Sequence, residues 1–517
     1  MSVVPVSAAR LPPISGAAHA AAAELGRALK GRISLDEQDR LAYSRDMWPK
    51  ALLWVREGRI PPPPDAVVWP RDEAEVVEIV RIARAHRIPL IPFGAGSGVC
   101  GGVLAVQGGI AVDLKRLERV GRVDPESLTV EAQAGVLGEV LERNLNAQGY
   151  TLGHFPSSIY MSTLGGWLAA RSAGQLSSLY GKIEDMTVGV RAVLGTGEVV
   201  ATPQRPRRGP DLAQLLIGSE GTLCLFTAAT LRVHPYPEER AFRGLRFRTV
   251  AEGVEAMRRL FRAGLRPAVA RLYDPFDTAL VARSRHKGPA TPPSLRGVVR
   301  ADVLPALTRQ LSARTLGRPG WINRAADLFR SCLLVLMFEG EARRTAREEE
   351  HARALCLRTG GEDLGEEPAR NWYRERYAVS YKMSKVVDNG AFADTMEVAA
   401  TWDKVLDVYE RVRAAVAPVA FVVCHFSHAY QEGCSLYFSF VASGSDDVDQ
   451  ERRYDQLWRT ALSAAVSAGA TVSHHHGVGL LKQTQLREEL GEGRRMLEAL
   501  KRACDPDGIL NPGKLTL

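Results

Sequence analysis

Long apolar runs are missing from this chain of 517 residues. A helix that spans a bilayer needs about 20 consecutive, mostly apolar residues, and no run approaches that length. The Ala-rich start, AARLPPISGAAHAAAAELG, also lacks the charged segment followed by an apolar one that marks a secretory signal. We therefore expect neither a membrane span nor secretion, and the expected location is the cytoplasm.

Cysteine is scarce as well. The seven cysteines are an odd number, and they are scattered along the chain without CxxC spacing. This pattern excludes a disulfide framework or a zinc ribbon and predicts reduced, cytosolic thiols.

Acidic residues are scarce in one part of the chain, residues 283–330. Two acidic residues, Asp302 and Asp327, stand there against ten basic ones. The basic residues are Arg283, Arg285, Lys287, Arg296, Arg300, Arg309, Arg314, Arg318, Arg324 and Arg330. A solvated, Arg-rich insertion is the simpler interpretation, and peripheral contact with an anionic membrane surface is the second. No nucleic-acid-binding module is recognisable, so a nucleic-acid partner is not expected.

What is present is an ordinary globular composition, with 45% hydrophobic and 24% charged residues. At this length it predicts more than one domain. Helical and strand-like patterns alternate without an internal repeat, which indicates an α+β protein. We expect a helical segment over 1–60, one domain over 61–236, a second over 237–480, and a helix with a tail over 481–517 that returns to the first domain.

The most conspicuous motif of the first domain is IPFGAGSGVCGGV, in which residues 96–101 match the pattern GxGxxG. In a dinucleotide-binding unit of the Rossmann type these glycines open a helix, whereas here turn and strand signals follow them. An extended loop whose backbone amides surround an anion is one interpretation, and a plain tight turn is the other.

A second conspicuous motif, ATVSHHHGVGLLK, places His474, His475 and His476 between a β-branched run and a Gly-Val-Gly turn. A metal site, a catalytic cluster and an exposed loop are all compatible with three adjacent imidazoles.

The glycine loop, the segments STLGGWLA and YGKIEDM, and the segment GSEGTLCLFT together resemble the PCMH-type FAD-binding domain of the vanillyl-alcohol oxidase type flavoproteins. Within that superfamily the resemblance is greatest to the alkylglycerone-phosphate synthases (alkyldihydroxyacetonephosphate synthases), and it runs from LWVREGRIPPPPDAVVWP to CDPDGILNPGKL. The resemblance implies an α+β fold of two domains. One would bind FAD, and the other would be a substrate or cap domain with an antiparallel sheet.

Carried over by position, the resemblance assigns four segments to FAD. They are Pro92, Phe93, Gly94, Ala95, Gly96, Ser97 and Gly98; Ser157, Ser158, Ile159, Tyr160, Met161, Ser162 and Thr163; Ala170, Arg171, Ser172 and Ala173; and Glu220, Gly221, Thr222, Leu223, Cys224, Leu225 and Phe226. Covalently flavinylated relatives have a histidine after the glycine loop, and this chain has none there. Noncovalent FAD is therefore implied.

The resemblance also implies the catalytic residues Tyr437, His154, His474, His475 and His476. In the synthases a base takes a proton from the carbon next to a ketone, the flavin traps the substrate, a fatty acid leaves and a fatty alcohol replaces it. Imidazoles suit such proton exchange because their ordinary pKa is about 6.5. The implied function is replacement of the acyl group of an acyl-dihydroxyacetone phosphate-like substrate in ether lipid synthesis.

The alternative function is that of an FAD-linked oxidoreductase or dehydrogenase acting on a 2-hydroxy acid or another hydroxylated substrate. Some such enzymes bind a metal through a GHxGDGNxH motif and a Glu-His-Gly triplet. This chain has CHFSHAYQEGCSLYF instead, with Tyr437 near the second histidine and His475 in place of the glutamate. We therefore expect no metal site of that kind.

One departure bears on the substrate. Where the synthases carry an Arg-Asp pair linked to substrate recognition, this chain has Met383 and Ser384. Methionine cannot bind a phosphate or carboxylate through paired hydrogen bonds. Lys382 and Lys385, or Arg374 and Arg376, are the candidate replacements. Arg271 matches the family pattern, with substrate binding and a structural salt bridge as its two interpretations. A small or lipid-like substrate is expected. A homodimer is an open expectation.

Overall fold

The computed structural model describes residues 11–204, 209–284, 323, 330–377 and 391–517. Lys382, Met383 and Ser384 lie outside the described residues, as does almost all of the basic segment 283–330. Membrane contact through that segment stays a prediction. Within the part that is described, no helix combines the length and the apolar character that crossing a bilayer requires.

The chain divides into two compact units. Unit 1 comprises Met1–Tyr236 and Ser473–Leu517, and unit 2 comprises Pro237–Val472. The segment with the three histidines therefore belongs to unit 1, whereas the expected boundary at residue 480 would assign it to the second domain. The physical reason is hydrogen bonding: the amides of Val478 and Gly479 donate to Glu220 of unit 1.

Unit 1 contains two four-stranded sheets. In the first, of order β1-β2-β4-β3, strand β4 runs parallel to both of its neighbours; the second, of order β5-β9-β7-β8, is antiparallel. The strands of unit 1 are β1 (Ile33–Ser34), β2 (Ala66–Val68), β3 (Leu90–Phe93), β4 (Ile110–Asp113), β5 (Thr129–Gln133), β6 (Tyr150–Thr151), β7 (Thr187–Leu194), β8 (Val199–Ala201), β9 (Cys224–Arg232) and β10 (His234–Pro235).

The helices of unit 1 include α4 (Glu73–His86), whose start and end follow local rules. The side chain of Asp72 accepts a hydrogen bond from the amide of Glu75 and so caps the first turn. Arg87 ends the helix in the left-handed conformation. The remaining helices are α1 (Gly16–Ala28), α2 (Glu37–Ala42), α3 (Pro49–Arg56), α5 (Gly138–Ala147), α6 (Leu164–Ala170), α7 (Ser177–Tyr180), α8 (Ile183–Met186), α9 (Leu212–Leu216), α19 (Gln483–Leu490) and α20 (Gly493–Cys504).

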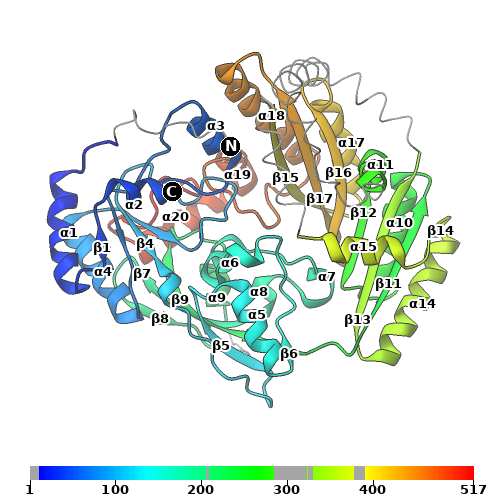
Figure 1. Ribbon diagram of the computed structural model, residues 1–517, viewed down its shortest axis with the longest axis horizontal. Coiled ribbons are helices and arrows are strands. Elements are labelled where there is room, and N and C mark those ends of the chain that lie inside the picture. The colour runs from blue at the N-terminus through cyan, green and yellow to red at the C-terminus, as the bar shows by residue number, and fades with distance from the viewer. Residues whose placement is uncertain (1–10, 205–208, 285–322, 324–329, 378–390) are drawn as a thin grey trace, which may run out of the picture. The chain divides into compact units, whose positions relative to one another are not determined.

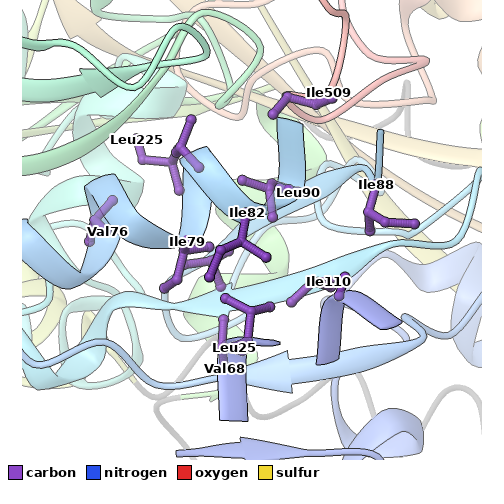
Figure 2. Close-up of a cluster of buried hydrophobic side chains, with 14 of the residues drawn as sticks. Leu25, Val68, Val76, Ile79, Ile82, Ile88, Leu90, Ile110, Leu225 and Ile509 are labelled. Carbon is purple, nitrogen blue, oxygen red and sulfur yellow. The ribbon is translucent and has the colours of Figure 1, made fainter. Parts of the chain in front are cut away.

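The core of unit 1 lies between α1, α4 and the parallel strands. Leu25 of α1, Ile79 and Ile82 of α4, and Leu90 and Ile110 of the sheet are fully buried in one cluster (Figure 2). Burial of such side chains contributes about 1.5–3 kcal/mol each. The expected separate segment 1–60 is therefore part of this unit, because α1 packs in its core.

Unit 2 is built on one antiparallel sheet of seven strands, of order β14-β11-β13-β12-β16-β17-β15 (Figure 1). Its strands are β11 (Glu239–Phe247), β12 (Val269–Tyr273), β13 (Cys332–Gly340), β14 (Glu362–Asp363), β15 (Ala391–Thr401), β16 (Phe421–Ala429) and β17 (Gly433–Ser443). Its helices include α10 (Val250–Arg262), α11 (Pro275–Ser284), α14 (Ala342–Arg358), α15 (Glu367–Glu375), α17 (Val405–Val416) and α18 (Asp447–Ser467). The expected α+β class with an antiparallel sheet in the second domain is confirmed.

Two further expectations are confirmed. Residues 94–109, which follow β3, contain no helix, so the glycine loop does not open a Rossmann helix. None of the seven cysteines forms a disulfide, and all of them are buried.

Candidate functional site

The glycine loop, residues 92–98, makes close contacts with two of the other segments that were expected to hold FAD. A β-carbon added to Gly94 would lie 2.4 Å from Oγ1 of Thr163, and one added to Gly221 would lie 2.3 Å from Cγ of Pro92. Only glycine allows such approaches, because real β-carbons do not come within 3 Å of other heavy atoms. The segments 157–163 and 220–226 therefore meet at the glycine loop.

The remaining expected segment, 170–173, and the residue before it contact the chain around Glu220. The amide of Glu220 donates to the carbonyl of Ala169 at 3.0 Å. The side chain of Arg171 packs against Gly218, where a β-carbon would lie 2.5 Å from the arginine Nε. The structure thus brings all four sequence-predicted segments together within unit 1, and we call this group of segments the cradle.

Helix α6 fixes the end of the segment 157–163. Thr163 caps this helix by accepting a hydrogen bond from the amide of Gly166 at 3.3 Å. The indole of Trp167 donates to Oγ of Ser162 at 2.8 Å. Local sequence therefore orients the segment before any ligand binds.

Asp46 holds the glycine-rich residues that follow the glycine loop by hydrogen bonds, and the sequence analysis did not identify it. Its carboxylate accepts hydrogen bonds from the amides of Trp48 (3.0 Å), Gly101 (3.0 Å) and Gly102 (3.1 Å). Burial raises the pKa of Asp46 to about 7. No local pattern around YSRDMW reveals this role, because the two glycines lie 55 and 56 residues further along the chain.

Asp46 should make the stability of the protein depend on pH. Its pKa is about 7 when folded, and about 3.9 when unfolded. The unfolded chain thus loses this proton at a lower pH than the folded protein does, and wild-type stability should fall as the pH rises between those two values. Asp46→Asn cannot ionise. Urea unfolding of both proteins at several pH values should show the wild type losing stability relative to the variant, and parallel curves would contradict the assignment.

His474, His475 and His476 form a compact group in unit 1. Nδ1 of His474 lies 3.0 Å from Nδ1 of His475. The rings of His475 and His476 pack edge to face, with centroids 4.5 Å apart. Two imidazole nitrogens at hydrogen-bonding distance can share one proton between them. We call residues 474–479 the histidine loop.

His154 lies in the core of unit 1. It is 1% exposed, and its ring centroid is 4.5 Å from that of Trp167. Burial lowers its pKa to about 3, so the ring is neutral at physiological pH. Among the described residues, neither ring nitrogen has a hydrogen-bond partner. A neutral ring of this kind suits hydrogen bonding to a ligand better than it suits proton exchange.

The residues present fit a bound FAD in two respects. The cradle presents glycine backbone where a nucleotide pyrophosphate must approach closely. His154 offers buried polar atoms that have no partner among the described residues, and buried polar atoms are nearly always paired when a site is complete.

Unit 2 places a line of polar side chains on one face of its sheet. Tyr273 pairs with His425, His425 with Tyr437, and Tyr437 with Glu397 across neighbouring strands. Residues in direct register point to the same face. We call these four residues the polar row. His425 and Glu397 were missed by the sequence analysis. The alternating pattern of CHFSHAY, followed by a second strand, could have indicated His425.

Tyr437 is held in the polar row by two contacts. Its hydroxyl donates to Oγ1 of Thr395 at 3.0 Å, and its ring stacks on His425 with centroids 4.7 Å apart. Burial raises the pKa of Tyr437, whereas its hydrogen bond with Thr395 and the charge of Arg271 oppose that rise. The phenol is therefore protonated unless a neighbouring base takes its proton.

Arg271 and Asp277 supply charge beside the polar row. The guanidinium carbon of Arg271 lies 5.2 Å from the centroid of the Tyr273 ring. Nδ1 of His425 lies 3.6 Å from a carboxylate oxygen of Asp277. Burial, followed by the charge of Arg271, lowers the pKa of His425 well below its ordinary value. Burial raises the pKa of Asp277 to about 6.

The other candidate substrate residues are placed differently. The side chain of Arg374 is 66% exposed on α15, where it pairs with Glu367 at 3.1 Å and also contacts Asn371. Lys382 lies outside the described residues. Of the two candidates that the structure describes, Arg271 lies beside the polar row, whereas Arg374 lies on α15.

Comparison with known proteins extends over nearly the whole chain. Residues 64–203 match a family model described as an FAD binding domain, and residues 236–515 match one described as the C-terminal domain of FAD linked oxidases. The chain is 31% identical over 507 residues to alkyldihydroxyacetonephosphate synthase of Trypanosoma brucei brucei, covering 94% of this chain and 78% of that protein. It is 25% identical to glycolate oxidase subunit GlcD of Bacillus subtilis, covering 92% of each.

Solved structures agree with these sequence matches. A structure of alkyldihydroxyacetonephosphate synthase superposes with a TM-score of 0.77 at 25% identity, covering 98% of this chain and 87% of that one. Substrate-bound p-cresol methylhydroxylase superposes with a TM-score of 0.70 at 17% identity, covering 98% and 99%. The latter likeness concerns the fold alone.

Proposed function

We propose that this chain, an FAD-dependent enzyme of the family of FAD-linked oxidases, is a non-redox transferase like the alkyldihydroxyacetonephosphate synthases it resembles. The proposed reaction replaces the acyl group of an acyl-dihydroxyacetone phosphate-like substrate with a fatty alcohol. The observation that carries this proposal is Tyr437: a phenol stands in the polar row, bonded to Thr395 and stacked on a neutral imidazole.

Noncovalent FAD would be held by the cradle. Gly94 to Gly98 and Gly221 would receive the pyrophosphate on bare backbone, and His154 would offer a neutral hydrogen-bonding ring. When bound, FAD would supply an electrophilic ring that accepts electron density from the substrate.

Tyr437 would exchange the proton of the carbon next to the substrate ketone. A partly buried phenol acts as a base only if its own proton is taken up by another group. Arg271 would bind the anionic group of the substrate, since guanidinium groups pair with phosphate and carboxylate through two parallel hydrogen bonds.

The alternative is an FAD-linked oxidoreductase acting on a 2-hydroxy acid. The similarity to glycolate oxidase subunit GlcD of Bacillus subtilis favours it, as does a 28% identity to an uncharacterized FAD-linked oxidoreductase of Escherichia coli K12 that covers 88% of this chain and 89% of that protein. Arg271 suits a carboxylate as well as a phosphate.

Anaerobic mixing distinguishes the two functions. We expect the visible flavin absorbance to persist when purified protein is mixed with 2-hydroxy acids, because a transferase leaves the flavin oxidised after each turnover. Incubation with an acyl-dihydroxyacetone phosphate and a long-chain alcohol should yield an ether product and free fatty acid by mass spectrometry. Bleaching of the flavin by a 2-hydroxy acid, without an ether product, would favour the oxidoreductase.

A further inference from the structure

Glu220 occupies an unusual position in the cradle. Its backbone is in the left-handed region, with φ at 48°, which is rare for a residue with a side chain. Its carbonyl accepts a hydrogen bond from the side chain of Asn511 at 2.7 Å, and the same amide group of Asn511 donates to the carbonyl of Gly102 at 3.0 Å. The backbone of Glu220 is thus tied to the C-terminal segment and to the glycine-rich region.

The carboxylate of Glu220 contacts a different segment, the histidine loop. Oε1 accepts the amide of Val478 at 2.5 Å, and Oε2 accepts the amide of Gly479 at 2.8 Å. Gly477, with φ at 81°, comes so close that an added β-carbon would lie 2.8 Å from Oε1. Both oxygens therefore bind the histidine loop directly after its third histidine.

The side chain of Glu220 is partly buried, and the charges of Lys482 and Lys514 act on it. A hydrogen bond to its ionised form is about twice as strong as one to its neutral form. Burial raises the pKa of Glu220, while the two amides and the charges of Lys482 and Lys514 act in the opposite direction. Lys514 is itself fixed by donating to the carbonyl of Leu104 at 2.8 Å. The loop has a second attachment at Leu480, whose amide donates to the carbonyl of Cys100 at 2.8 Å.

We propose that Glu220 is a positioning residue for catalysis: its carboxylate fixes His474–His476 through the amides of Val478 and Gly479, while its backbone belongs to the cradle. The resemblance assigns Glu220 to the cofactor, but its carboxylate is already engaged by the histidine loop. One residue would thereby set the position of the imidazoles against the segment 220–226. The inference rests on the proposed function in taking these imidazoles to be catalytic.

Glu220→Gln tests this role, because an amide group can accept one backbone amide but turns an NH₂ group toward the other. In FAD-loaded protein we expect amide hydrogen exchange of the peptide spanning 473–482 to become about tenfold faster. The loop opens more easily once a hydrogen bond to residue 220 is lost. The FAD-to-protein ratio should stay the same. With the transferase substrates, kcat should fall about tenfold to a hundredfold with little change in KM.

Glu341→Gln is the control. Glu341 precedes α14 in unit 2, and its Oε1 and Oε2 accept the successive amides of Arg343 (3.0 Å) and Arg344 (2.9 Å), as Glu220 does with Val478 and Gly479. Its replacement should leave both the exchange of 473–482 and kcat unchanged. If Glu220→Gln does not fold, Gly477→Ala tests the same contact from the loop side.

The exchange measurement needs no substrate, so it separates this inference from the proposed function. Unchanged exchange of 473–482 in Glu220→Gln would overturn the inference. Loss of FAD without faster exchange would also overturn it, because Glu220 would then be a cofactor ligand. Faster exchange without any ether-forming activity in the wild type would leave the loop contact established and reject the proposed reaction.

Discussion

Gly96→Val is expected to yield colourless protein, whereas the wild type should be yellow and release FAD on denaturation without proteolysis. Gly96 has φ at 65°, and an added β-carbon would lie 2.9 Å from Cζ of Phe93. A β-branched side chain must therefore shift the loop backbone, and the left-handed conformation alone costs about 1–2 kcal/mol. The shifted loop would no longer fit the pyrophosphate. The ratio of flavin to protein absorbance measures the effect.

Gly197→Val is the control for backbone strain. Gly197 also has a positive φ, 88°, but nothing lies within 4 Å of an added β-carbon in the β7–β8 turn. This variant should lose stability and keep its FAD. Gly96→Val with a full complement of FAD would refute the role of the glycine loop. A colourless wild type that fails to take up added FAD would refute the flavin site itself.

Tyr437→Phe and at least one alanine variant among His474, His475 and His476 are expected to remain yellow and lose most activity. Removal of a general acid or base typically lowers the rate about a hundredfold to ten-thousandfold. Phenylalanine keeps the ring that stacks on His425 and removes only the hydroxyl that donates to Thr395. Turnover and flavin content, measured on the same samples, separate the chemistry from cofactor retention.

Two variants serve as controls for that experiment. Tyr454→Phe removes a different, buried hydroxyl of unit 2, which donates to Asp394 at 2.5 Å, and should cost stability but little activity. His351→Ala removes an exposed histidine of α14 and should change neither. Activity that a chelator abolishes and zinc or manganese restores would identify the histidine loop as a metal site instead of a proton-exchange group.

Much of the fold could be predicted from the sequence because its signals are local or carried by motifs. Glycine-rich turns such as those at Gly96 and Gly221 can be predicted from the local sequence, because glycine adopts backbone conformations that other residues avoid. Continuous apolar runs such as CLLVLMFEG and FVVCHFSHA are typical of buried strands, and these two segments form β13 and β16. The four segments of the cradle could likewise be named before their contacts were known.

The tertiary structure alone decided which distant groups meet. Asp46 caps the amides of Gly101 and Gly102, and Glu220 binds amides 258 and 259 residues away. A carboxylate that accepts backbone amides leaves no mark on the residues it binds, since every residue except proline carries the same N–H group. The register of β16 and β17 set His425 against Tyr437 in the same way. The sequence determined the chemical groups and the local turns, and long-range packing determined their partners, because a side chain's partner depends on chain folding that no local pattern encodes.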